Sequence, residues 1–366
     1  MSRIPITARQ ASHTPQNYQP REKALVSPRF FYDRWDVEKR KPGNLAPSRK
    51  NMEGEKLPEP YKRPLLNSAT TESKSYNNMT TSIQTNRRAF LAGSVLTLFC
   101  EKVAVSEQTS PLRIGMITDL HYADKDARGS RHYRESLQKI EEATRSFQTA
   151  KVDFVVELGD LIDEAKDAIT ETAWLQEIDS KFKKMPGRRN YVLGNHCVAT
   201  LSKTDFLKTV GQEKSYYSFD AKGVHVVVLD ACFRKDGVEY DQGNFNWQDC
   251  AIPAKELNWL RSDLKSTKLP TVVFVHQRLD DTERYSVKNA SEVRGVLEKS
   301  GKVMAVFQGH NHKNEHREVN GIHYCTLTAM VEGRGEANNG YAILTVEPNG
   351  NLTIDGFRKQ ANYKWG

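Results

Sequence analysis

The chain has 366 residues, enough for one large domain or two small ones. No apolar run approaches the roughly 20 residues that a bilayer-spanning helix needs, so no stable membrane span is expected. The formal net charge is +8, but residues 1–106 carry 18 Lys and Arg against 9 Asp and Glu, while residues 107–366 carry 36 against 37. The basic excess lies outside the part with globular patterning, so no nucleic-acid partner is expected.

Residues 1–78 are polar and charged, and prolines recur throughout them. Their one apolar cluster, around Phe30 and Trp35, is too small for a core. Such a segment cannot bury enough apolar surface to offset its ordering entropy, so we expect it to be disordered. Because Met79 stands just ahead of a signal-like segment, translation is alternatively expected to start there, which would make residues 1–78 an annotation artefact.

Residues 79–106 have the three parts of a secretory signal. Arg87 and Arg88 precede the apolar run 89–99, and the small residues Ala104 and Ser106 follow it. The segment resembles a twin-arginine export signal, which implies a periplasmic or secreted protein. A short buried helix is the alternative, because the apolar length fits either.

Five cysteines are present, and one of them, Cys100, falls in the signal-like segment. The other four, Cys197, Cys232, Cys250 and Cys325, are expected to be buried free thiols, because none of their spacings fits a zinc finger. If the protein is exported, a Cys232–Cys250 disulfide is the alternative.

From residue 112 onward, short apolar runs alternate with charged segments of helical length. Strands are predicted at 113–118, 153–158, 190–193, 224–229, 271–275, 303–308, 322–327, 340–346 and 352–357. Helices are predicted at 131–149, 164–184, 203–210, 253–266 and 289–299, with Pro253 in the first turn of its helix. The alternation predicts one α/β domain over residues 107–366, with a turn at Pro348-Asn349-Gly350 between the last two strands.

Polar clusters follow five of the predicted strands. They are Asp119-Leu120-His121, Gly159-Asp160-Leu161-Ile162-Asp163, Gly194-Asn195-His196, His276 and Gly309-His310-Asn311-His312. The carboxyl ends of strands in an open α/β sheet gather at one edge, where ligands bind. We therefore expect these side chains to converge, although they span almost two hundred positions. Each cluster alone is common by chance, but five in order after five apolar runs argue against coincidence.

The converging set contains imidazoles, two carboxylates and one carboxamide, which suits two divalent ions such as Mn²⁺, Fe²⁺ or Zn²⁺ better than Ca²⁺. Asp119 and His121 are two residues apart, as are His310 and His312, so on extended segments each pair would point the same way. The three glycines at 159, 194 and 309 remove side-chain bulk where backbones must crowd.

The ordered signature, from residue 112 to 331, resembles the calcineurin-like metallophosphoesterases. The resemblance implies a four-layer α/β/β/α sandwich of two mixed sheets flanked by helices. It also implies that Asp119, His121 and His312 hold one metal ion. The implied ligands of the second are Asn195, His276 and His310, with Asp160 shared and catalytic. His196 would then contact the phosphate or protonate the leaving oxygen.

Three positions refine this resemblance. Cys197 stands where the family usually has Asp or Glu, which leaves the tuning of His196 open. Asp163 occupies a position where purple acid phosphatases carry Tyr, which argues against that branch. Arg278, two residues after His276, either meets the substrate phosphate, together with Asn195 and His196, or forms a surface salt bridge.

Two ions about 4 Å apart lower the pKa of a shared water, so the predicted reaction is hydrolysis of a phosphoric ester by a metal-activated hydroxide. The 195–276 segment contains aromatic residues that could enclose an organic group: Tyr216, Tyr217, Phe233, Tyr240, Phe245 and Trp247. It also resembles the cyclic-nucleotide phosphodiesterases and the ADP-ribose/CDP-alcohol diphosphatases. We therefore expect a small-molecule phosphodiester or phosphoanhydride as substrate; a phosphomonoesterase, or a non-catalytic module that keeps the fold, is the alternative.

Overall fold

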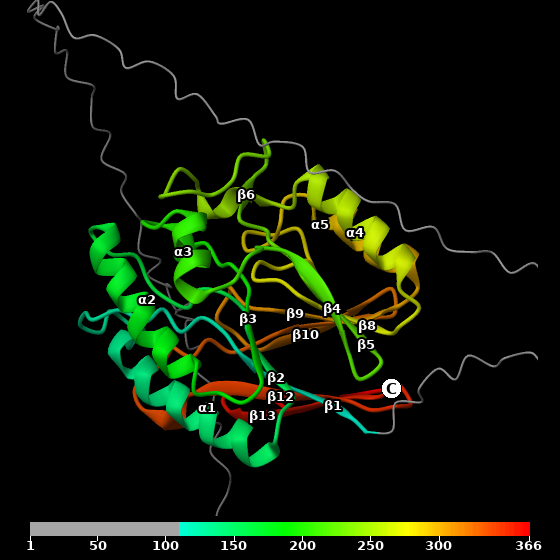
Figure 1. The fold of residues 1–366 in the computed structure, drawn as a ribbon, viewed down its shortest axis with the longest axis horizontal. Helices are drawn as coiled ribbons and strands as arrows, with labels where there is room; N and C mark the ends of the chain where they lie inside the picture. The colour runs from blue at the N-terminus through cyan, green and yellow to red at the C-terminus, as the bar shows by residue number, and fades with distance from the viewer. Residues whose placement is uncertain (1–109) are drawn as a thin grey trace, which may run out of the picture. The chain divides into compact units, whose positions relative to one another are not determined.

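The computed structural model describes residues 110–366, which form two six-stranded sheets packed face to face (Figure 1). The predicted N-terminal extension, the signal-like segment and Cys100 lie outside the described residues. The first sheet has the order β14-β13-β12-β1-β2-β3. Its strands in chain order are β1 (Leu112–Ile117), β2 (Phe154–Glu157), β3 (Arg188–Tyr191), β12 (Gly340–Val346), β13 (Leu352–Arg358) and β14 (Tyr363–Trp365).

The second sheet has the order β10-β11-β9-β8-β5-β4. Its strands are β4 (Tyr217–Ala221), β5 (Val224–Val228), β8 (Thr271–Phe274), β9 (Val303–Gln308), β10 (Glu315–Val319) and β11 (Ile322–Thr326). Both sheets are mixed. In the first sheet, β1, β2 and β3 run parallel and β12 pairs antiparallel with β1. In the second, β5, β8, β9 and β11 run parallel, and the edge strands β4 and β10 pair antiparallel with their neighbours. A small ribbon joins β6 (Phe233–Arg234) to β7 (Cys250–Ala251).

Helices cover the outer faces of both sheets (Figure 1). Beside the first sheet lie α1 (Ser136–Ala150), α2 (Ala168–Phe182) and α3 (Lys203–Val210), and beside the second lie α4 (Ala254–Ser266) and α5 (Ala290–Ser300). Short 3-10 turns are η1 (Tyr133–Glu135), η2 (His196–Val198), η3 (Trp247–Asp249) and η4 (Glu336–Asn338). The predicted four-layer α/β/β/α sandwich is therefore confirmed. None of the helices in residues 110–366 is long and apolar enough to cross a membrane.

Alternation along β1 shows how the sequence builds these layers. Ile114 and Met116 are fully buried in the core between the two sheets, whereas Ile117 belongs to the core beneath the helices. Gly115 faces α1, where an added Cβ would lie only 2.7 Å from the ring of Phe147. A side chain at this position would push α1 away from the sheet, so the glycine permits their close packing.

The predicted helices and strands are all present, with shifted ends. The first two helices begin at Ser136 and Ala168, later than predicted, and Asp167 caps the second by accepting a hydrogen bond from the Thr170 amide at 2.8 Å. Pro253 immediately precedes α4 as its N-cap rather than sitting in its first turn. The four cysteines of the described part are free and buried, which confirms the prediction of buried free thiols. The alternative, a Cys232–Cys250 disulfide, is not present in this part of the chain.

Candidate metal centre

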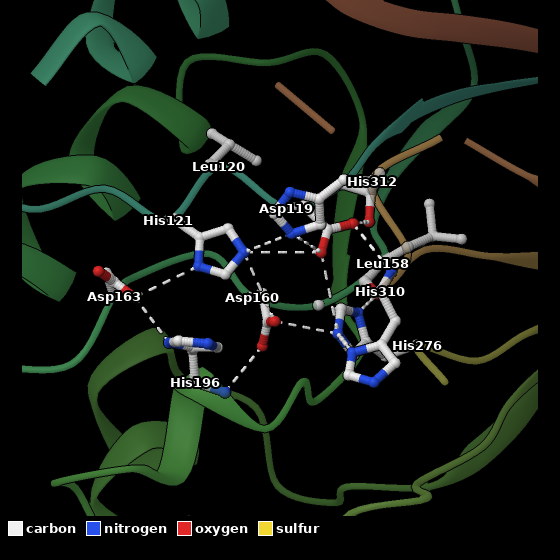
Figure 2. A network of polar contacts seen from close by, with 12 residues as sticks. Asp119, Leu120, His121, Leu158, Asp160, Asp163, His196, His276, His310 and His312 are labelled. Carbon is white, nitrogen blue, oxygen red and sulfur yellow. Dashed lines mark hydrogen bonds and ion pairs between the residues drawn. The ribbon is translucent and has the colours of Figure 1, made fainter. Parts of the chain in front are cut away.

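The polar clusters predicted from the sequence meet where strands of both sheets end (Figure 2). The loops after β1, β2 and β3 come from the first sheet, and the loops after β8 and β9 come from the second. The side chains that converge include Asp119, His121, Asp160, His196, His276, His310 and His312. The structure thus brings together residues from most of the length of the domain.

One group of possible metal ligands consists of Asp119, His121 and His312. The Nε2 atoms of the two imidazoles lie 3.1 Å apart, and they lie 3.7 Å (His121) and 3.4 Å (His312) from Oδ1 of Asp119. That oxygen is buried and accepts no hydrogen bond. Buried polar atoms are normally paired, so donor atoms that face one another without a partner fit a cation at their centre.

A second group consists of Asp160, His276 and His310. Nε2 of His276 lies 3.1 Å from Oδ2 of Asp160 and 3.2 Å from Nδ1 of His310. The same Asp160 oxygen lies 3.6 Å from Nε2 of His121 in the first group, which is the position that a shared ligand requires. Asn195 is buried, and its Oδ1 has no hydrogen-bond partner either. The donor set therefore fits two divalent ions.

The backbone at this centre is not extended, so the alternation reasoning was wrong in its premise, although Asp119 and His121 do join one ligand group as expected. Asp119, His121, Asp160, His310 and His312 all have positive φ angles, between 43° and 73°. Side-chain-bearing residues rarely adopt this left-handed conformation, which costs about 1–3 kcal/mol each. His310 and His312 consequently diverge and join different ligand groups.

The three glycines next to the site leave room for its side chains, as the sequence predicted. A Cβ on Gly159 would lie 2.4 Å from Nδ1 of His276, and one on Gly194 would lie 2.2 Å from Oδ1 of Asp160. A Cβ on Gly309 would lie 2.6 Å from an Asp119 carboxylate oxygen. These approaches are too close for any side chain, so the ligand geometry requires glycine at each position.

Hydrogen bonds on the outer side of three imidazoles determine which nitrogen faces the centre. Nδ1 of His276 lies 2.8 Å from the Leu158 carbonyl oxygen, and Nδ1 of His312 lies 2.6 Å from the Glu332 carboxylate. Nδ1 of His121 lies farther, at 3.4 Å, from Asp163. A proton on Nδ1 leaves Nε2 unprotonated, so the Nε2 lone pair faces the centre and can bind a metal ion.

Asp163 also contacts His196, and sequence reasoning missed this pairing. Its Oδ1 lies 2.6 Å from Nδ1 of His196, and Lys125 forms an ion pair with the same carboxylate. The acid that the sequence seemed to lack at position 197 is thus supplied by Asp163, three residues after Asp160. Cys197 itself is fully buried, and burial raises the pKa of its thiol well above the usual range.

Opposite pKa shifts show that the carboxylates give the centre its negative charge. Burial favours the neutral form of Asp119 and Asp160, but His276 and the other adjacent imidazoles together outweigh burial and lower both pKa values. Burial also opposes the charge on His276, yet the two carboxylates raise its pKa to about 9. Burial, followed by repulsion from His276, lowers the pKa of His310 to about 3. Ionised carboxylates and the neutral His310 suit cation binding, whereas His276 would have to release its proton when a metal ion binds.

Arg278 does not have the role expected of a substrate contact. Its guanidinium is buried and donates to Asp280 at 2.9 and 2.6 Å, and it also pairs with Asp281 at 3.2 Å and Glu315 at 2.7 Å. The pKa of Arg278 is raised further, because these carboxylates outweigh burial. The residue is the centre of an interior ion network, which fits the salt-bridge alternative, although the bridge is buried and not at the surface.

Only one of the aromatic residues proposed to enclose a substrate contacts a site residue in the described part. Trp247 packs edge-on against His310, with ring centroids 5.5 Å apart, and Tyr285, which the sequence did not suggest, does so at 5.7 Å. The others pack elsewhere: Tyr216 lies against Trp259, and Tyr240 stacks on Phe245. The expected aromatic wall is therefore reduced to Trp247 and Tyr285, on the His310 side of the centre.

Known proteins share this sequence pattern and fold. A manganese-dependent ADP-ribose/CDP-alcohol diphosphatase of Arabidopsis thaliana is 25% identical over 60% of this chain and 86% of its own length. A probable cyclic nucleotide phosphodiesterase of Fibrobacter succinogenes is 28% identical over 55% of this chain and 73% of its own length. The fold matches a dimetal phosphatase from Danio rerio with a TM-score of 0.62 and 18% identity, over 69% of this chain and 98% of that one.

A family model supplies the last comparison. It describes the calcineurin-like phosphoesterases and matches residues 112–314, more than half of the chain. The matched region begins with β1 and ends just after His312, so it contains each of the ligand groups described above. The chain belongs to the calcineurin-like phosphoesterase family of metal-dependent hydrolases.

Proposed function

We propose that this metallophosphoesterase hydrolyses a phosphodiester or phosphoanhydride bond in a small, nucleotide-type molecule. The observation that carries the proposal is the pair of ligand groups joined by Asp160, with His196 beside them. Two divalent ions held by these groups would lower the pKa of a coordinated water and supply the nucleophile near neutral pH.

His196 is positioned to act on the leaving group. Its side chain is 23% exposed, while most of the surrounding residues are buried, so a substrate can reach it. Its backbone N–H donates to Oδ1 of Asp160 at 2.8 Å, which ties it to the shared ligand. Because Nδ1 faces Asp163, Nε2 is the ring atom from which a proton can pass to the leaving oxygen.

Two features favour a small organic substrate over a phosphoprotein. The relatives described above are named for a diphosphatase acting on ADP-ribose and CDP-alcohols and for a cyclic nucleotide phosphodiesterase. In addition, Trp247 and Tyr285 are both partly exposed beside His310, with ring centroids 5.5 Å apart. The two rings are tilted by 32°, and the Arg284 guanidinium lies over both, so a nucleobase would pack against this aromatic and arginine cluster.

Steady-state kinetics test the proposal directly. With Mn²⁺ present, we expect kcat/KM for ADP-ribose or bis-p-nitrophenyl phosphate to exceed the value for p-nitrophenyl phosphate. Trp247→Ala should raise KM for ADP-ribose and leave the p-nitrophenyl phosphate reaction unchanged, with Trp259→Ala as the control for loss of an aromatic ring. A kcat/KM ten times higher for the monoester would show that the chain is a phosphomonoesterase instead.

We also propose that the protein is exported, with a mature chain that begins near Glu107. The support is the sequence alone: the twin arginine Arg87-Arg88, the apolar run after it and the small residues before position 107. Export by this route moves folded proteins, which suits a centre that binds metal before transport. N-terminal sequencing of the native protein is the test, and finding residues 1–106 intact on a cytoplasmic protein would refute export.

A further inference from the structure

Residues 330–333, between β11 and η4, pass directly behind the first ligand group. They lie beyond residues 112–314, the region that the family model matches. Within this segment, the Glu332 carboxylate lies 2.6 Å from Nδ1 of His312. The side chains of Glu332 and His312 are 27% and 14% exposed, so the contact is partly shielded from water. A residue outside the region that the family model matches therefore contacts a residue inside it.

The segment is fastened to the loop that carries Asp119. The backbone amides of Met330 and Val331 donate to the carbonyl oxygens of Thr118 and Asp119 at 3.1 and 3.0 Å. These bonds continue beyond the end of β1, so the segment is joined directly to the loop that carries Asp119.

A buried lysine of α1 fixes the same segment from the other side. Lys139 is fully buried, and its ammonium donates to the carbonyl oxygens of Met330, Glu332 and Gly333 at 2.6, 3.0 and 2.7 Å. All three N–H bonds of the ammonium are therefore used on backbone atoms. Burying a lysine is costly unless its charge is fully satisfied, so its position here indicates a specific anchoring role.

The second ligand group has no equivalent support among the described residues. The outer contact of His276 is the neutral Leu158 carbonyl, and Nε2 of His310 has no hydrogen-bond partner. His312 instead faces a carboxylate.

We propose that Glu332 is a positioning residue that fixes His312 with its proton on Nδ1 and its Nε2 toward the first metal ion, and that Lys139 holds Glu332 in place. The inference rests on the metal-binding part of the proposed function. A carboxylate behind a ligating imidazole restricts the ring to one tautomer and orientation and increases its basicity. The first ion should therefore bind more tightly because of a residue that does not touch it.

Metal titration of the metal-depleted full chain tests this proposal. Isothermal titration with Mn²⁺ should show affinity for one ion falling by about 10- to 100-fold in Glu332→Ala, while affinity for the other is unchanged. Glu332→Gln keeps an acceptor without the charge and should give a smaller loss. Lys139→Met should weaken the same ion. The control Glu336→Gln removes a carboxylate of the neighbouring η4 that pairs with Arg145 and should change nothing.

Nitrogen NMR of the metal-depleted protein gives a second readout. The wild-type spectrum should show His312 protonated on Nδ1, and Glu332→Ala should show a mixture of tautomers or mainly the Nε2 form. Unchanged metal affinities together with an unchanged tautomer would overturn the inference, even if Lys139→Met fails to fold. Failure of the wild type to bind two ions would instead contradict the proposed function, and the tautomer would still decide the role of Glu332.

Discussion

Replacing Asp163 with Asn should slow catalysis without removing the metal ions. In the structure, the carboxylate lies 2.6 Å from Nδ1 of His196 but 3.4 Å from Nδ1 of His121. Burial alone would raise the pKa of Asp163, but the hydrogen bonds of His121 and His196 outweigh it and keep the pKa well below its usual range. The side chain is therefore an anion at neutral pH, and the substitution removes a full negative charge.

The magnitude follows from the shorter contact. An ion pair as short as this one is comparable with a hydrogen bond to a charged group, which contributes about 1.5–3 kcal/mol, and 1.36 kcal/mol corresponds to a factor of ten. If the population of molecules with His196 correctly oriented falls in proportion, kcat should fall by about 10- to 150-fold. The longer contact with His121 is weaker, so both ions should remain bound at saturating Mn²⁺.

The assay compares kcat, KM and bound metal in Asp163→Asn and in a matched surface variant. Asp124→Asn is the control, because that carboxylate is 65% exposed and pairs only with Arg134 among the contacts described for it. The control should behave as the wild type. A value of kcat within threefold of the wild type would refute the role assigned to Asp163. Loss of metal at saturating Mn²⁺ would show that it acts through His121 instead.

Further predictions concern the shared ligand, the proton donor and the fold. Asp160→Asn should abolish activity and lower the metal content that elemental analysis measures. His196→Ala should keep both ions and lower the rate by about 10²–10⁴-fold. Loss of metal in His196→Ala would contradict the role of His196 as proton donor. The pKa of His225 is raised from 6.5, chiefly by its hydrogen bond with Asp263. The stabilisation that His225 gives the folded state is thus complete below pH 6.5 and is lost as the pH rises through the folded-state pKa. In urea titrations, the difference in the free energy of unfolding between the wild type and His225→Gln should therefore become smaller as the pH rises through that range. Gly115→Ala, whose Cβ would lie 2.7 Å from a ring of α1, should lower the free energy of unfolding by about 1–3 kcal/mol, and unchanged urea stability would argue against tight packing there.

The sequence predicted the layers and the place of the site because both depend on simple periodic patterns. Buried parallel strands appear as continuous apolar runs, and their ends mark one edge of each sheet. Strand β10 was missed because its residues, Glu315–Val319, are mostly polar and the strand lies at an edge of its sheet. The helix starts were predicted too early because charged residues before Ser136 and Ala168 fit a helix as well as they fit a loop.

The contacts behind the ligands could not be predicted in the same way. The pairing of Asp163 with His196 joins loops after β2 and β3, and that of Glu332 with His312 joins two segments twenty residues apart. Neither follows from alternation, because the direction of these side chains depends on left-handed residues in the loops. The position of Asp163, three residues after Asp160, was the one signal in the sequence for its contact with His196. We used it only to distinguish this chain from the purple acid phosphatases, which carry Tyr at that position.

Hydrogen bonds within the fold hold the strained backbone of the ligand loops. Left-handed residues persist only where the surrounding structure compels them. Here the Asp119 amide donates to the Gly159 carbonyl at 3.0 Å, and the His121 amide donates to the Asp160 carbonyl at 2.8 Å, so the strained loops are bonded to each other. A centre organised in this way pays the cost of ordering its ligands during folding. Hydrogen bonds between the two loops therefore hold Asp119, His121 and Asp160 in the conformation that brings their side chains together.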